Sequence, residues 1–261
     1  MVKEGAHGRT PDFGARTVAG AAVFTAFVFA ATFSFTAATS TGGYFDIGEV
    51  MVYITALVMG PYVGAFAGGV GSMLSDALLA PQFAPGTLVI KGAEGFIVGY
   101  LGRRGFGAAE QMYDSVKVLL AAAVGAAVAV IGIVCFPDVS LSLGELPYTP
   151  VASTPDFVLS AWLWIAAGVV AFAATFALSG KLGGQFTWIA LSIFLGGGEM
   201  VLGYFLYETQ VLGLGLVAPT AEIPVNLLQA AVGLILAPYV AVRVRSAFSR
   251  RMPQSRGALT S

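Results

Sequence analysis

The feature that most constrains this chain is a series of long apolar runs that few charged residues interrupt. Residues 17–38, for example, form a run of 22 residues without a charge, and about 20 apolar residues are enough for a helix to cross a bilayer. Charged residues make up 10% of the chain, whereas a soluble domain has about 25%. The sequence therefore predicts an all-α polytopic membrane protein without a soluble domain.

About eight spans are expected from the spacing of these runs. The first run is longer than the apolar region of a signal peptide, about 7–15 residues, so we expect it to remain as an uncleaved helix. The expected spans are residues 17–38, 47–59, 61–80, 87–101, 116–136, 157–179, 187–207 and 223–242.

The distribution of Lys and Arg predicts the orientation of these spans. With a cytoplasmic N-terminus and alternating spans, nearly all basic residues lie inside, and the exception, Lys91, lies within a span. This agrees with the positive-inside rule, so we expect a multi-pass protein of the cell (plasma) membrane with both termini cytoplasmic. The basic C-terminal tail is interpreted as a topology signal near anionic lipid, and it is too short to predict binding to nucleic acid.

Residues 42–101 organise the rest of the chain. They contain three short, glycine-containing apolar segments with ionisable side chains inside them. A charge within a bilayer segment costs at least ~2.5–3.5 kcal/mol on insertion scales and usually has a function. Short membrane segments interrupted by glycine also indicate a substrate site, because irregular backbone is tolerated only where it is buried or lines a cavity.

The polar residues of the spans are expected to meet in the outer half of the membrane. The predicted orientation places nearly all of them there, and polar groups that avoid lipid must meet one another or a cavity. The candidate substrate-binding residues are Tyr44, Asp46, Glu49, Lys91, Glu94, Glu199, Tyr204, Tyr207, Glu222, Asn226 and Gln229. With several carboxylates and one lysine, such a pocket favours a cationic or polar neutral ligand over an anion.

Several of these residues also have a structural interpretation. Lys91 and Glu94, three residues apart on one helix face, are placed to neutralise each other. Asp76, which is not among the candidates, fits the role of bracing the neighbouring loop. Asn226 and Gln229 could form hydrogen bonds between helices. Tyr204 and Tyr207, in the seventh span, could belong to an interfacial aromatic belt.

Motifs for catalysis or metal binding do not occur in the sequence. His7 is the one histidine and lies in the polar N-terminal stretch, and Cys135 is the one cysteine and lies in an apolar run. A histidine-ligated metal site and an internal disulfide are therefore not expected. No G-x-x-x-x-G-K-[ST], G-x-S-x-G or H-E-x-x-H motif is present, so we expect neither an enzyme nor a cofactor or metal site.

Five segments, taken in order, resemble the substrate-binding (S) components of energy-coupling factor (ECF) transporters. They are residues 42–49, 68–76, 84–95, 202–208 and 221–229. The resemblance covers roughly residues 17–102 and 187–243. It implies a high-affinity membrane receptor for a vitamin or related micronutrient, whose ligand lies near the outer face against the first loop and the last three helices.

The resemblance also implies partners. Such a receptor works with a transmembrane coupling subunit and two ABC ATPases. In the family, a small-xxx-small pattern on the first helix contacts the coupling subunit, and Ala22 and Ala26 match this pattern here. Small residues at this spacing allow two helices to approach closely.

The resemblance divides the chain into a six-helix core and an insertion. The expected parts are a cytoplasmic tail (1–16), the first four spans (17–102), an inserted transmembrane hairpin (103–186), the last two spans (187–243) and a basic cytoplasmic tail (244–261). The acidic loop at 137–156 has no Lys or Arg, and we expect it outside, over the pocket or against a partner.

Two other functions remain as alternatives. A stand-alone secondary transporter would carry protons through Asp76, Glu94 and Glu199 and would need no ATPase. An intramembrane enzyme is disfavoured because the catalytic motifs do not occur. The sequence names neither the ligand nor the oligomeric state.

Overall fold

Eight helices form most of the described chain. The computed structural model describes residues 14–38, 42–105, 114–135, 139–141, 157–159 and 161–251. The helices are α1 (Ala15–Ser34), α2 (Gly48–Met59), α3 (Pro61–Leu79), α4 (Ala84–Gly105), α5 (Asp114–Cys135), α6 (Ala161–Leu182), α7 (Gly184–Leu206) and α8 (Val217–Arg251), and a π-helix, η1 (Tyr207–Val211), continues α7. Each of the eight expected spans therefore corresponds to a helix.

Within the described residues, six helices are long and apolar enough to cross a membrane, judged by length and composition. They cover Thr17–Ser34, Pro61–Leu79, Asp114–Val134, Ala161–Leu182, Gly184–Val211 and Val217–Ser246. The other two are α2, which is apolar but has only 12 residues, and α4, which carries Lys91 and Glu94 near its middle. The chain is an all-α polytopic membrane protein, as the sequence predicts.

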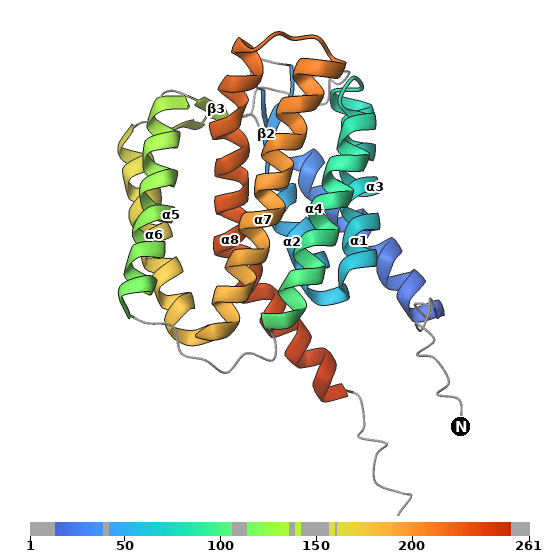
Figure 1. Ribbon diagram of the computed structural model, residues 1–261, viewed down its shortest axis with the longest axis vertical. Helices are drawn as coiled ribbons and strands as arrows, with labels where there is room; N and C mark the ends of the chain where they lie inside the picture. Colours follow the sequence, from blue (N-terminus) through green and yellow to red (C-terminus); the bar gives the residue numbers. More distant parts are fainter. Residues whose placement is uncertain are drawn as a thin grey trace, which may run out of the picture.

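The helices pack side by side as a bundle (Figure 1). The α5 and α6 helices form a pair at one edge, and α8 is their main neighbour in the rest of the bundle. The α7 and α8 helices lie between this pair and the group formed by α1 to α4. α5 and α6 thus lie beside the other six helices.

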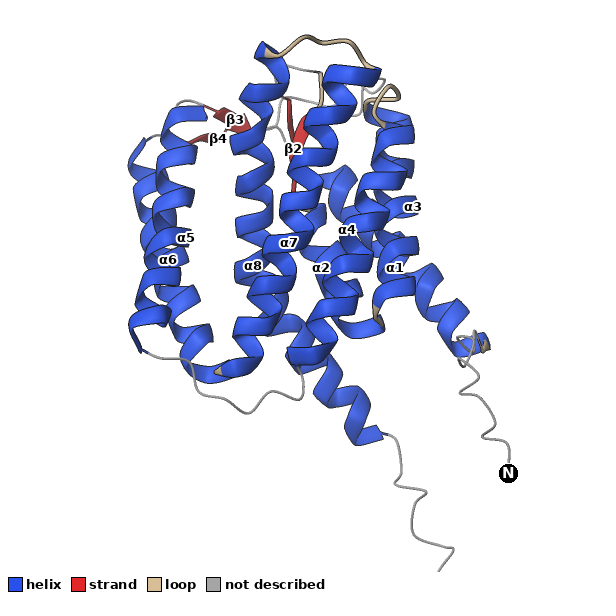
Figure 2. Cartoon of the chain, in the orientation of Figure 1, coloured by secondary structure: helices blue, strands red, loops and turns tan. Residues whose placement is uncertain are grey.

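Two small antiparallel sheets lie at one end of the bundle (Figure 2). β1 (Thr36–Ala38) pairs with β2 (Tyr44–Asp46), and β3 (Val139–Leu141) pairs with β4 (Phe157–Leu159). Residues 44–46, which lie between the first two expected spans, therefore form a strand, because pairing with β1 satisfies backbone N–H and C=O groups outside the helices. For the same reason α1 ends before residue 38 and α6 begins after residue 157. Most of the acidic loop at 137–156 lies outside the described residues.

Residues 208–222, which lie between the last two expected spans, are also largely helical. η1 occupies its beginning, and α8 starts at Val217 with Pro224 inside the helix. Proline is tolerated within membrane helices because neighbouring groups satisfy the backbone that it frees. This early start adds Glu222 to the helical part of α8, near the end of the bundle.

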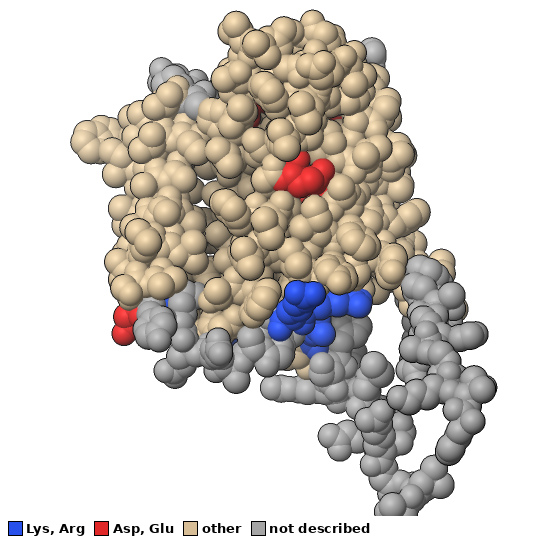
Figure 3. All heavy atoms as spheres, viewed as in Figure 1, with Lys and Arg blue, Asp and Glu red and all other residues tan. Residues whose placement is uncertain are grey.

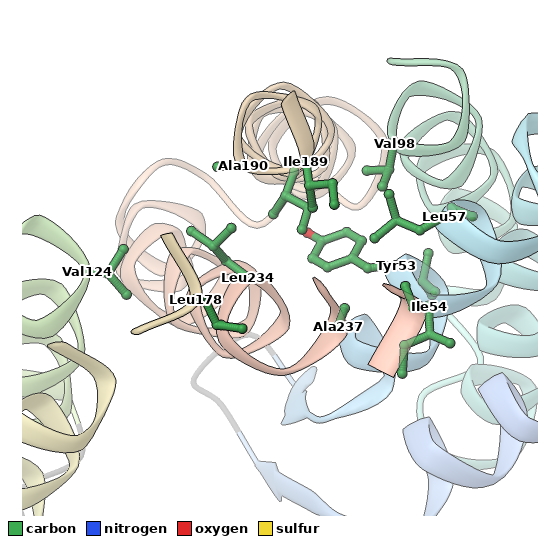
Figure 4. Close-up of a cluster of buried hydrophobic side chains, with 14 of the residues drawn as sticks. Tyr53, Ile54, Leu57, Val98, Val124, Leu178, Ile189, Ala190, Leu234 and Ala237 are labelled. Carbon is green, nitrogen blue, oxygen red and sulfur yellow. The ribbon is translucent and has the colours of Figure 1, made fainter. Parts of the chain in front are cut away.

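The apolar core draws buried residues from all eight helices, most of them from α2, α7 and α8. Tyr53 of α2 is fully buried, and its ring lies beside Leu57, Val98 and Ile189 (Figure 4). A buried tyrosine needs a partner for its hydroxyl, and Tyr53 donates a hydrogen bond of 2.8 Å to Glu94 Oε1. The apolar core therefore borders directly on a polar cluster.

Close contact between α3 and α4 depends on glycine. A Cβ at Gly64 would lie 2.7 Å from the carbonyl oxygen of Gly95, so the two backbones would have to separate. We expect Gly64→Ala to lower the free energy of unfolding by about 1–3 kcal/mol, as overpacked sites do, measured by thermal unfolding in detergent.

The matched control is Gly198→Ala on α7. A Cβ there would meet no atom within 4 Å, and alanine favours a helix by about 1 kcal/mol over glycine. This variant should be as stable as the parent or slightly more so. Equal losses in both variants would contradict the packing argument.

Candidate functional site

A polar cavity lies at the end of the bundle that carries the β1–β2 sheet. Its volume is about 40 Å³, which is room for about three water molecules. The lining residues are Gly43, Tyr44, Asp46, Asp76, Ala80, Phe83, Lys91, Tyr204, Glu208, Glu222, Asn226 and Gln229. A vitamin-sized ligand needs a pocket of roughly 300–1,000 Å³, so binding such a ligand would require this cavity to widen.

The basic residues gather at the opposite end. Arg103 and Arg104 lie in the last turn of α4, Lys181 lies in the last turn of α6, and Arg243 and Arg245 lie in the last third of α8. Figure 3 shows this basic group at the bottom of the visible face. The cavity and the basic group therefore mark the two ends of the molecule.

Asp76 connects three elements at the cavity. Its carboxylate accepts hydrogen bonds from the hydroxyls of Tyr44 on β2 and Thr87 on α4. The Thr87 hydroxyl also lies 2.9 Å from the Tyr204 hydroxyl of α7. Burial, with the nearby carboxylates, raises the pKa of Tyr44, so its hydroxyl keeps its proton and serves as the donor.

Asp46 connects β2 to α2 and α8. The Gly48 N–H donates to Asp46 Oδ1 at 2.6 Å, and Gln229 Nε2 donates to Oδ2 at 3.0 Å. Burial raises the pKa of Asp46 to about 7, against the lowering effects of Lys91 and of the Gly48 N–H. A carboxyl group in this position changes its charge near neutral pH.

The raised pKa of Asp46 predicts a pH-dependent stability. Between about pH 4 and 7 the folded state holds a proton that the unfolded state has released, so stability falls as pH rises, by up to about 1.4 kcal/mol per pH unit. Asp46→Asn removes this titration. We expect melting temperatures in detergent to fall less from pH 5 to pH 7 for Asp46→Asn than for the parent, and equal slopes would contradict the assignment.

Lys91 lines the cavity and belongs to a buried ion-pair cluster. Its Nζ pairs with Glu49 of α2 and lies 3.3 Å from Glu94 Oε2. All three residues are at most 5% exposed. Lys91 Nζ also lies 5.6 Å from the centre of the Tyr204 ring. The structure thus contains the Lys91–Glu94 pair that the sequence suggests, and it adds Glu49.

The structure places most of the candidate residues at the cavity, and the others beside it or elsewhere. Seven line the cavity: Tyr44, Asp46, Lys91, Tyr204, Glu222, Asn226 and Gln229. Glu49 and Glu94 pair with Lys91 behind it. Tyr207 does not line it but packs its ring on Gly86 and donates to the Gln82 carbonyl at 2.9 Å. This position joins η1 to the start of α4.

Glu199 does not line the cavity either. It is only partly buried, and among the described acidic residues only Asp114 is more exposed. One carboxylate oxygen, Oε2, is buried without a hydrogen-bond partner. Figure 3 shows an acidic patch near the middle of the visible face, with uncharged residues around it and the basic group below.

Two acidic residues of the cavity were not among the candidates. Asp76 was expected to brace a loop, and it does hold β2 and α4, but it also lines the cavity. Glu208 lies in η1. A π-helical turn changes the direction of a side chain and has no simple sequence signal, although such turns are frequent at functional sites.

The lining chemistry suits an organic ligand. Hydroxyl, amide and carboxylate groups lie next to the side chains of Ala80 and Phe83. Among the described residues, no three His, Cys, Asp or Glu side chains are arranged to hold a metal ion. A small molecule with polar groups matches this mixture of apolar and hydrogen-bonding walls.

Comparisons with known proteins agree with this arrangement. Residues 13–155 match the family described as "ECF-type riboflavin transporter, S component". The chain is also 38% identical over 117 residues to an "Uncharacterized protein in gap 3'region" of Pyrococcus woesei. The aligned residues cover 44% of this chain and 68% of that protein. No solved structure matches this chain.

Proposed function

The chain belongs to the S components of ECF transporters, and from this premise we propose that it is the membrane-embedded, high-affinity substrate-binding subunit of an ECF-type ABC importer for a vitamin or related micronutrient. The observation that carries this proposal is the polar cavity, whose lining comes from β2, α3, α4, η1, α7 and α8. Riboflavin, which the name of the matched family specifies, is one candidate ligand.

The proposed orientation places the cavity at the outer face. The basic groups of α4, α6 and α8 lie at the other end, and the positive-inside rule favours that end in the cytoplasm. Both termini would then be cytoplasmic. A receptor that captures a nutrient needs its site on the side from which the nutrient arrives.

We also propose that α1 to α4, α7 and α8 form the binding core, with α5 and α6 as an added hairpin. The family match extends through α5, but the cavity takes no residue from either α5 or α6. The hairpin therefore serves a role other than direct contact with the ligand.

The proposed partners are a transmembrane coupling subunit and two ABC ATPases. Ala22 and Ala26 lie exposed on α1, together with Ala15, Ala19 and Ala30. An exposed strip of small side chains allows another helix to approach closely. This surface supports the expected contact with the coupling subunit.

Native mass spectrometry of the detergent-purified chain, expressed in rich medium, tests the receptor function. A retained adduct of vitamin size supports it and identifies the ligand by mass. Uptake in liposomes should then require the coupling subunit and ATPases. Proton-driven uptake without any ATPase would instead favour a stand-alone secondary transporter.

The coupling contact makes a separate prediction. The double variant Ala22→Leu/Ala26→Leu fills the exposed strip of α1, so we expect co-purification with the coupling subunit to fall at least tenfold while ligand binding stays unchanged. Ala166→Leu, at an exposed alanine of α6, is the control and should co-purify normally. Normal assembly of the double variant would exclude this surface as the contact.

A further inference from the structure

The cavity is strongly acidic. Four carboxyl groups line it, from Asp46, Asp76, Glu208 and Glu222, and Lys91 is its single basic residue. The charge of Lys91 is already balanced, because Glu49 and Glu94 both pair with it. The cavity therefore holds more carboxyl groups than basic groups that could balance them.

Glu208 differs from the two aspartates of the cavity. Asp46 and Asp76 each accept hydrogen bonds from two protein donors. Glu208 is 2% exposed, and its Oε2 has no hydrogen-bond partner in the described chain. A buried carboxylate oxygen without a donor is strongly unfavourable unless a ligand or a proton satisfies it.

The local backbone directs this side chain to the cavity. Glu208 lies in the π-helical turn η1, between the end of α7 and the start of α8. Turns of this type are frequent at functional sites. Glu222, on the first two turns of α8, lines the same cavity.

Resting on the receptor function proposed above, we propose that the ligand is an organic cation whose positively charged group binds between Glu208 and Glu222. A cationic group would satisfy the unpartnered oxygen of Glu208. The wall formed by Ala80 and Phe83 matches the apolar part of an organic cation and does not match a hydrated metal ion.

The experiment uses the full chain, purified in detergent. The cargo retained from rich medium is identified by native mass spectrometry, and binding of thiamine (a cation), riboflavin (neutral) and biotin (an anion) is then measured by titration calorimetry. We expect a cationic cargo, or at least tenfold tighter binding of thiamine than of riboflavin and biotin. Glu208→Gln should weaken binding of the cation at least tenfold, and Glu208→Asp should retain the preference.

Asp114→Asn is the matched control, because Asp114 is an exposed carboxylate at the start of α5 and does not line the cavity. It should bind the cation as the parent does.

Three results would overturn the cation proposal and leave the receptor function intact. They are a neutral or anionic cargo, equal or tighter binding of riboflavin or biotin, and unchanged affinity in Glu208→Gln. No cargo and no binding of any of the three probes would count against both.

Discussion

Replacing Lys91 with methionine is expected to destabilise the protein by about 3–5 kcal/mol, because the change leaves two buried carboxylates without their cation. Glu49 is 1% exposed and Glu94 is fully buried. Tyr53 still donates to Glu94, but nothing in the described chain replaces Lys91 as a positive charge beside them. Thermal unfolding in detergent and the yield of folded protein measure the loss.

A triple variant separates charge from packing. In Lys91→Met/Glu49→Gln/Glu94→Gln the cluster is neutral, and replacing a buried ion pair with neutral groups is often tolerated. Most of the lost stability should return. If the triple variant is as unstable as Lys91→Met, then the volume and shape of the side chain decide stability at this position.

Lys117→Met provides the matched control for the lysine change. Lys117 pairs at 2.8 Å with Asp114, whose side chain is 92% exposed. Exposed ion pairs contribute little to stability. We expect a small change in melting temperature, far below that of Lys91→Met.

Asp76→Ala is expected to weaken ligand binding at least tenfold and to destabilise the protein by about 3 kcal/mol. The carboxylate accepts from Tyr44 and Thr87, and a hydrogen bond to a charged group contributes about 1.5–3 kcal/mol. Without it, two hydroxyls at the cavity lose their acceptor, and β2 loses its connection to α4. Calorimetric titration with the retained ligand and thermal unfolding measure the two effects.

Ser75→Ala is the control for Asp76. Ser75 is also buried, and its hydroxyl lies 3.2 Å from that of Tyr44, so the variant removes only a weak neutral contact. We expect an affinity within about threefold of the parent, since a neutral hydrogen bond contributes about 0.5–1.5 kcal/mol.

A double-mutant cycle of Tyr44→Phe with Asp76→Ala should show coupling, because the two residues bond directly. Additive effects would contradict the connection.

The spans and the clustering of polar residues were predictable because their causes are local. An apolar run of sufficient length specifies a membrane helix wherever it occurs, and α1 and α5 are examples. Alternation of the spans then places all outer helix ends together. This is why Tyr44 on β2 and Asn226 on α8 were both expected at one pocket, although the chain separates them widely.

The role of each polar residue was not predictable in the same way. Glu49, Glu94 and Glu208 are all buried acidic residues, but two neutralise Lys91 and the third faces the cavity. The difference depends on the rotation of each helix and, for Glu208, on the π-helical turn. Local sequence specifies neither of these.

The sequence by itself determined the membrane helices, the end of the bundle at which the polar groups meet and the family resemblance. Tertiary structure alone decided which of those groups share a cavity and which satisfy one another. The physical reason is distance along the chain: Gln229 and Asp46 bond across 183 residues, and Thr87 and Tyr204 across 117. Such partners are chosen by how the helices pack, and no local pattern records that choice.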